Sequence, residues 1–173
     1  MHVSISNRYA QGPAPDLPAL INLHESNYVR LMRLMPDLVN LRGTVVSRVS
    51  GAQDLYLSVD DRYKYTTNLM LTYCFKSSLG VVLEPRATIC VYHDVRAVDL
   101  VSHCRRHRSR KLFPWSRRGH MPELDRRWEM NRFLYKWLRF CTHQGHLFLN
   151  FNVQAAPDPR LQACSVRASR SAD

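Results

Sequence analysis

The stretch that decides the fold is PELDRRWEMNRFLYKWLRFC, residues 122–141. Its large apolar side chains recur every three or four residues, which is the spacing of one face of an α-helix. They are Met130, Phe133, Leu134, Trp137, Leu138 and Cys141. Pro122 and Glu123 suit the first turn of a helix, and Gly145 suits its end. Burying each such side chain contributes about 1.5–3 kcal/mol before the entropy cost, so we expect this helix to pack on a sheet.

A second helix is predicted over Leu17–Leu34. Asp16 can accept a hydrogen bond as its N-cap, and Pro36 ends it because the residue before a proline avoids the α conformation. The residues at helical spacing are Leu17, Leu20, Ile21, His24, Tyr28, Leu31 and Met35.

The residues between the two helices predict short strands with short connections, which favours an antiparallel meander. The expected strands are Thr44–Val49, Leu55–Val59, Tyr65–Phe75, Ala87–Tyr92 and Ala97–Ser102, with turns or loops at Asp60–Asp61, Ser77–Gly80 with Pro85, and Asp94–Arg96. Leu147–Gln154 alternates and could add one last strand. The fold class is therefore α+β: an antiparallel sheet of about five strands with an N-terminal helix and a long C-terminal helix packed on it.

A chain of 173 residues fits a single domain. We expect a flexible leader at 1–16, one α+β domain at 17–154 and a disordered tail at 155–173, where the composition turns to Pro, Ser, Ala and Arg.

The formal net charge is +11, and most of it lies in the segment His103–His120. That segment holds seven Lys and Arg residues and no Asp or Glu, which leaves +4 for the rest of the chain. A concentrated cationic segment attracts polyanions by releasing their counterions. It indicates an anionic partner, which could be nucleic acid, acidic protein or a nucleotide.

Five cysteines, an odd number with no CxxC pair, indicate a reducing compartment. The first fifteen residues lack the apolar core of a signal peptide, and no run of 18 apolar residues predicts a membrane span. We therefore expect a cytoplasmic protein that does not engage a membrane.

The candidate anion-binding residues combine cations with an aromatic ring, as sites for single-stranded nucleic acid or a nucleotide base do. They are Arg105, Arg106, Arg108, Arg110, Lys111, Trp115, Arg117 and Arg118. The structural alternative is a solvated loop that Phe113 and Trp115 pin to the core. Arg106 and Arg110 have the spacing of the arginine pair in cyclic-dinucleotide receptors of the PilZ type, but the Asp-x-Ser-x-x-Gly partner motif is absent.

A second candidate is the strand end Tyr92, His93 and Asp94. An imidazole beside a carboxylate could serve as a general base. Adjacent strand residues point to opposite faces, however, so we expect His93 to be half-buried and Asp94 to hold the turn.

Metal and enzyme signals are weak. Cys104 and His107, with His103 and His120 nearby, lack the paired spacing of a zinc site, and the arginines around them repel cations. There is no Gly-x-Ser-x-Gly, Walker or dinucleotide-binding motif. We expect no catalytic residue, no metal and no cofactor.

Three motifs resemble the YqiB-like family of small proteobacterial proteins of unknown function. They are the helix Leu23–Pro36 with Glu25, Asn27, Leu31 and Leu34, the strand end Val91–Asp94, and Asn131-x-Phe133-Leu134-x-x-Trp137-Leu138-x-Phe140-Cys141. The resemblance covers about Leu17–Val153. It implies a cytosolic bacterial protein with two helices and one sheet, and it implies no activity.

The sequence thus favours a non-enzymatic binding or adaptor protein that engages an acidic protein or a nucleic acid through its basic loop. Alternatives are a nucleotide or cyclic-dinucleotide sensor and, more weakly supported, a nucleotide hydrolase. Tyr135 and Phe140 lie off the apolar stripe and leave a homodimer surface open as well.

Overall fold

The structure, a computed structural model, describes residues 16–77, 80–104, 122–149 and 154–155. The expected leader before Asp16 and the expected tail beyond Ala155 lie outside these ranges.

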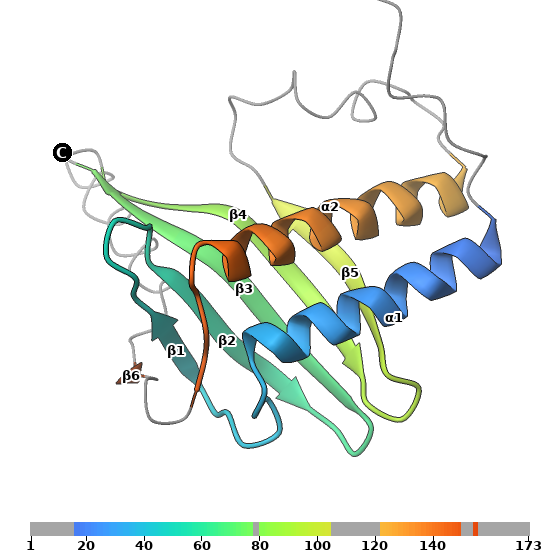
Figure 1. The fold of residues 1–173 in the computed structure, drawn as a ribbon, viewed down its shortest axis with the longest axis horizontal. Coiled ribbons are helices and arrows are strands. Elements are labelled where there is room, and N and C mark those ends of the chain that lie inside the picture. Colours follow the sequence, from blue (N-terminus) through green and yellow to red (C-terminus); the bar gives the residue numbers. More distant parts are fainter. Residues whose placement is uncertain (1–15, 78–79, 105–121, 150–153, 156–173) are drawn as a thin grey trace, which may run out of the picture.

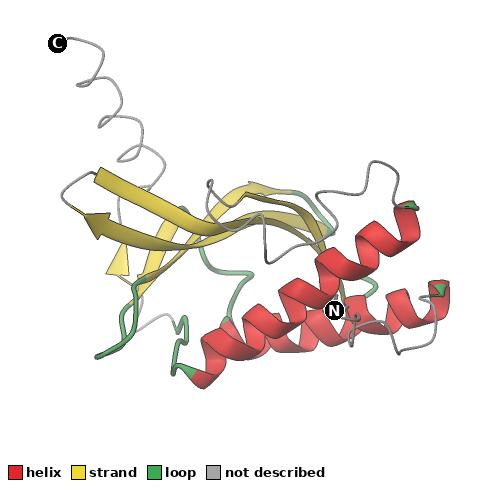
Figure 2. Cartoon of the chain, turned by 90° about the horizontal axis from the view of Figure 1, so that it is seen from above, coloured by secondary structure: helices red, strands yellow, loops and turns green. Residues whose placement is uncertain are grey.

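The sheet is an antiparallel meander with two helices on one of its faces (Figures 1 and 2). Along the chain the elements are α1 (Leu17–Leu34), β1 (Thr44–Ser47), β2 (Leu55–Arg62), β3 (Thr66–Ser77), β4 (Gly80–Tyr92), β5 (Ala97–Cys104), α2 (Glu123–His143) and β6 (Gln154–Ala155). The strand order is β5-β4-β3-β2-β1-β6. The predicted α+β class and meander are confirmed.

Helix α1 begins and ends where the sequence predicts. The side chain of Asp16 accepts a hydrogen bond from the Ala19 amide at 2.7 Å, and the helix stops just before Met35 and Pro36. The predicted buried face needs a correction, because Leu17 is 60% exposed and Ile21 is 49% exposed. The buried residues of α1 are Leu20, Asn27, Leu31 and Leu34, so its covered face is rotated around the helix axis away from Leu17 and Ile21.

Two predicted turns are in fact parts of strands. Asp60 and Asp61 lie within β2, where a bulge between Val59 and Asp61 absorbs one residue of the register. Pro85 lies within β4, opposite a register shift between Thr72 and Cys74 of β3. A proline lacks the amide hydrogen that a strand ladder needs, and a bulge is a position where that loss is tolerated.

Helix α2 buries nearly the predicted stripe: Met130, Asn131, Leu134, Trp137, Leu138 and Cys141. Phe133 is only half-buried, and Asn131 is buried instead. Gly145, at φ +87°, turns the chain after the helix, and its amide donates to the Thr142 carbonyl at 3.0 Å. A glycine suits this position because side chains disfavour positive φ.

A last strand over Leu147–Gln154 was left open by the alternation, and the structure tests it in part. Residues 147–149 are not in a strand: the Leu147 amide donates to Ser47 Oγ at 3.4 Å, and the Phe148 amide donates to the Leu34 carbonyl at the end of α1 at 2.8 Å. Residues 150–153 lie outside the described ranges. Gln154–Ala155 forms β6 and pairs with β1.

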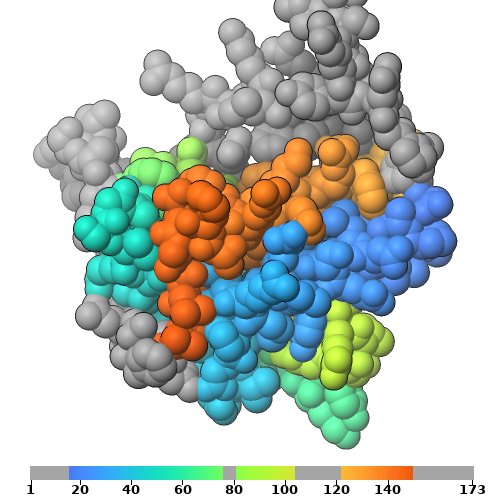
Figure 3. Space-filling view, viewed as in Figure 1, coloured from blue at the N-terminus to red at the C-terminus, as the bar shows by residue number. Residues whose placement is uncertain are grey.

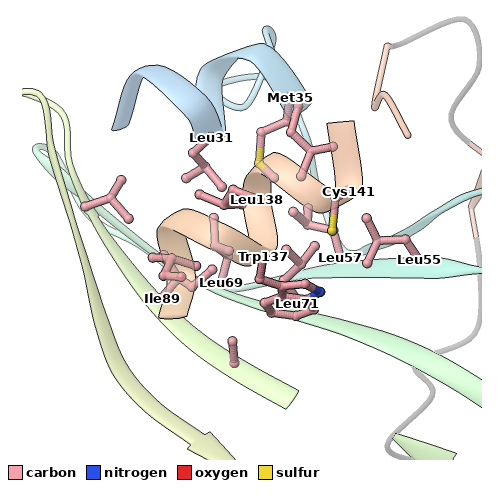
Figure 4. Packing of buried hydrophobic residues seen from close by; sticks show 14 of the residues in the cluster. Leu31, Met35, Leu55, Leu57, Leu69, Leu71, Ile89, Trp137, Leu138 and Cys141 are labelled. Carbon is pink, nitrogen blue, oxygen red and sulfur yellow. The ribbon is translucent and has the colours of Figure 1, made fainter. Parts of the chain in front are cut away.

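One main hydrophobic core lies between the helices and the sheet (Figure 4). Leu31 and Met35 descend from α1, Leu138 and Cys141 from α2, and side chains of β2, β3 and β4 meet them from below. Within the described residues the space between sheet and helices is therefore filled, and function has to be sought on the surface or in the polar contacts around this core.

Candidate functional site

The predicted anion-binding residues lie outside the described part of the chain, from Arg105 to Arg118. The residues on either side of them are described. His103, the last residue but one of β5, has its ring stacked on Phe133 of α2 at a centroid distance of 5.3 Å. Pro122 leads directly into α2. The basic segment therefore leaves the sheet beside α2 and rejoins the fold at the beginning of the same helix.

The strand end Tyr92–Asp94 does not gather into one site. His93 lies in the turn after β4, and its Nε2 is 2.9 Å from Thr67 Oγ1 of β3. Burial and the Arg62 charge lower the pKa of His93, while Asp94 opposes them. Asp94 itself is exposed. The expected half-buried histidine at a strand end fits these contacts.

Tyr92 lies near a different carboxylate. A hydrogen bond with Cys90, followed by burial and the charge of Asp99, raises the pKa of the Tyr92 hydroxyl. Asp99 belongs to β5, directly opposite Cys90 in the ladder. It is the centre of a polar cluster that the sequence did not reveal.

That cluster joins α1, β5 and α2 through two buried asparagines. Asn131 Nδ2 donates to Asp99 Oδ1 at 2.7 Å, and Asn131 Oδ1 accepts from the Leu100 amide at 3.1 Å. Asn27 Nδ2 donates to the Asn131 carbonyl at 3.1 Å. Both asparagines are fully buried. Leu100 belongs to β5, an edge strand of the sheet, so no neighbouring strand accepts the hydrogen bond of its amide. The side-chain oxygen of Asn131 accepts that hydrogen bond instead.

Two charged groups border the cluster. His24 Nε2 and Arg127 Nη1 each lie 3.6 Å from the Asp99 carboxylate. Burial lowers the pKa of His24 although Asp99 opposes it, so the ring is neutral near pH 7 and its contact with Asp99 is not a full ion pair. His24 Nε2 has no hydrogen-bond partner. The side chains of His24 and Asp99 are only 17% and 14% exposed, so a substrate could not reach this pair easily.

A second buried polar contact ties the end of α2 to β1. His146 Nδ1 lies 3.1 Å from Ser47 Oγ, and burial lowers the pKa of His146. Nearby, the Tyr73 hydroxyl and Cys141 Sγ are 3.4 Å apart. Burial raises the pKa of the Cys141 thiol to about 11, so this thiol is not a nucleophile at neutral pH. The contact is best explained as structural.

The outer face of α2 carries accessible cations and aromatic rings. An open hollow of about 630 Å³, here called the α2 groove, is lined by Leu23 of α1 and by Trp128, Arg132, Tyr135, Lys136, Arg139, Phe140 and His143 of α2. In Figure 3 the two helices form adjoining ridges on the face toward the viewer, α2 in orange and α1 in blue.

The charge of α2 is divided along its length. All three of its acids lie in the first two turns, and the stretch Met130–His143 contains none. Glu123 accepts hydrogen bonds from Arg126 and Arg127, which lower its pKa to about 2. The first turns are therefore internally neutralised, whereas the second half presents uncompensated positive charge.

Within the α2 groove, the described residues provide no ion-pair partner for Lys136 or Arg139, while Arg132 lies 3.4 Å from Glu129. The Arg30 guanidinium of α1 stacks over the Tyr135 ring at 3.9 Å and donates to its hydroxyl at 2.5 Å. Cations and aromatic rings thus alternate on one surface, with Phe140 50% exposed.

The residues of the α2 groove follow a pattern in the sequence, but the pattern is not a known functional motif. Cations and rings recur every three or four residues opposite the apolar stripe, in a stretch without acids. The sequence identified Tyr135 and Phe140 as off the stripe but did not connect them with Lys136 and Arg139. That connection depends on which face of the helix the sheet covers.

Among the described residues, no group of three or more His, Cys, Asp or Glu side chains is placed to hold a metal ion. Neither described helix combines the length and apolarity needed to cross a membrane.

Comparisons with known proteins indicate the same family as the sequence motifs. A family model described as "Protein of unknown function (DUF1249)" matches residues 30–147. The chain is 28% identical over 136 residues to the "Uncharacterized protein YqiB" of Escherichia coli strain K12, covering 76% of this chain and 91% of that protein. The YqiB protein of Escherichia coli O157:H7 gives the same values. No solved structure matches.

Proposed function

The chain belongs to the DUF1249 family of proteins of unknown function, the YqiB-like family, and on that footing we propose that it is a non-enzymatic binding protein for an anionic partner. The observation that carries the proposal is the α2 groove, where Lys136 and Arg139 lie among aromatic rings in a stretch of helix without acids. Uncompensated cations that share a surface with rings are typical of polyanion-binding sites.

The charge of the whole chain supports the same proposal. The segment His103–His120 adds seven cations without an acid; its first residue, His103, stacks on Phe133 of α2, and Pro122, two residues after its end, caps α2. A positive surface of this kind raises the local concentration of an anionic partner and its association rate. We expect the partner to be an acidic protein or a nucleic acid, and the compartment to be the cytoplasm.

A second candidate, hydrolysis of a nucleotide, has one observation in its favour. His24 and Asp99 are a histidine and a carboxylate close together, and the pKa of His24 is shifted, as at many catalytic sites. The pair is largely buried, and neither residue lines the hollow on α2, so binding is the better supported function. A sensor with a ligand between sheet and α2 would need space that the core side chains occupy.

The test removes charge from the basic segment. A variant with Arg105, Arg106, Arg108 and Arg110 changed to glutamine should bind a polyanion at least tenfold more weakly. For a nucleic acid the slope of log K against log salt should fall by about 3, since each lost phosphate contact contributes about 0.7–0.9. Fluorescence anisotropy at several salt concentrations measures both.

The matched control changes four cations elsewhere, Arg33, Lys64, Arg86 and Arg96, to glutamine. Equal losses in the two variants would mean that only net charge matters and would count against a defined site. Pull-down from a bacterial lysate with and without nuclease separates the partners: a protein that remains after nuclease indicates an adaptor, and a signal that disappears indicates nucleic acid.

A further inference from the structure

The aromatic rings of the α2 groove indicate which class of anionic partner it binds. We propose that the second half of α2 binds single-stranded nucleic acid, with phosphates on Lys136 and Arg139 and a base stacked on Phe140. This inference rests on the proposed function and specifies it at one surface.

The arrangement around Phe140 is the first argument. Its ring is 50% exposed, although Phe is normally withdrawn from water. Arg139 is its neighbour in the chain, Lys136 lies one turn before it and His143 three residues after it, and all four line the same hollow. One turn of helix rises about 5.4 Å, so the cations Lys136 and Arg139 lie within a nucleotide's reach of the ring.

The contact between the helices is the second argument. Arg30 is already fixed over Tyr135, 3.9 Å from the ring centroid. A guanidinium held over a ring is preorganised, so little conformational entropy is lost when a phosphate or a base approaches it. Tyr135, which carries this cation, lines the same groove as the exposed ring of Phe140.

A second copy of this chain is a poor occupant of the groove. Each copy carries a net charge of +11, and part of that charge lies in the groove on Arg132, Lys136 and Arg139. Two such faces would repel each other. Charge complementarity therefore favours a polyanion.

The exposed ring favours a nucleic acid over an acidic peptide. Carboxylates would use Lys136 and Arg139 but would gain little from the ring of Phe140. A nucleotide uses both, because base stacking on an aromatic ring contributes about 1–3 kcal/mol per base. A duplex would not satisfy the ring, because its bases stack on each other and offer only their edges in the grooves.

The first test removes the two kinds of contact separately. The probes are a labelled 12-nucleotide oligo(U), a duplex of the same length and labelled poly-glutamate, all measured against the full chain. Phe140→Ala should weaken oligo(U) binding about 5- to 150-fold and leave the salt slope unchanged. Changing Lys136 and Arg139 to glutamine should lower the salt slope by about 1.4.

Matched controls use residues outside the groove. Tyr63→Ala removes a ring that is 64% exposed in the turn between β2 and β3, and Arg33→Gln with Lys64→Gln removes the same charge elsewhere. Neither control should change oligo(U) binding as much as its partner variant. Phe140→Trp, which keeps a ring for stacking, should restore the affinity that Phe140→Ala loses.

The outcomes separate the two proposals. Oligo(U) binding that depends on Phe140 and exceeds duplex binding supports both. Binding of poly-glutamate or duplex with no effect of Phe140→Ala overturns this inference and leaves the proposed function standing. Absence of binding to all three probes at low salt overturns both.

Discussion

Asn131 uses every hydrogen-bonding position of its side chain from the middle of a helix. Its two amide hydrogens go to Asp99 and to the Arg127 carbonyl, and its oxygen accepts from Leu100 and, at 3.4 Å, from Asn27. A buried amide is stabilising only when its partners are complete, because each unsatisfied group retains its desolvation cost. The side chain of Asn131 therefore joins α1, α2 and β5 through hydrogen bonds.

We predict that Asn131→Ala destabilises the fold by about 2–4 kcal/mol, because it removes the acceptor of the Leu100 amide and the amide donor that lies 2.7 Å from Asp99 Oδ1. Urea unfolding followed by circular dichroism measures the change. Asn22→Ala, at an exposed position of α1, should change stability by less than about 0.5 kcal/mol. A small effect at Asn131 would mean that water replaces its contacts readily.

Three histidines make stability depend on pH. Burial lowers the pKa values of His24, His93 and His146 in the folded state. The unfolded chain takes up protons near pH 6.5, so below that pH it binds more protons than the folded chain does. Linkage then requires stability to be lost as the pH falls.

We predict that the free energy of unfolding is lower at pH 5.5 than at pH 7.5. Replacing His146 with Gln should reduce this difference, whatever it does to absolute stability. Urea titrations at the two pH values measure both effects. Equal stability at the two pH values would contradict the assignment of neutral histidines in the fold.

At the scale of elements, the helices were predicted well wherever the sequence carries a strong local signal, such as a capping residue or a proline. Asp16 as a cap and Pro36 as a stop set the bounds of α1, because capping and proline effects act within one turn. The apolar stripe of α2 was predicted for a similar reason. Pro85 and the pair Asp60–Asp61 misled because such residues usually mark turns, and only pairing with a neighbouring strand reveals that a bulge accommodates them.

The two ends of α1 provide a direct comparison of buried and exposed leucines. Leu31 is fully buried, whereas Leu17 is 60% exposed. We predict that Leu31→Ala costs about 2–5 kcal/mol, through lost burial and the cavity it leaves, and that Leu17→Ala changes stability by less than about 0.5 kcal/mol. Thermal and urea unfolding measure both. A large effect at Leu17 would mean that something covers the first turn of α1.

At the scale of the molecule, the charge of the chain can be counted in the sequence, whereas the α2 groove depends on the fold. The excess of cations in His103–His120 is visible by counting, and it is the basis of the predicted anionic partner. The α2 groove cannot be found by counting charges. Lys136 and Phe140 form one exposed surface only because the sheet covers the opposite face of α2. The composition of the chain predicts an anionic partner. The packing of α2 on the sheet decides which residues form the exposed surface proposed for that partner.

The bond between Asn27 and Asn131 has a consequence for how the chain is made. It joins residues 104 positions apart. A ribosome adds about 5–20 residues per second, so α1 emerges several seconds before its partner helix exists. During that interval β1 to β5 are made, but the helix that covers the sheet beside α1 is still missing. The domain can close only after α2 has been made, and until then the sheet face that α2 covers is open to chaperones and proteases.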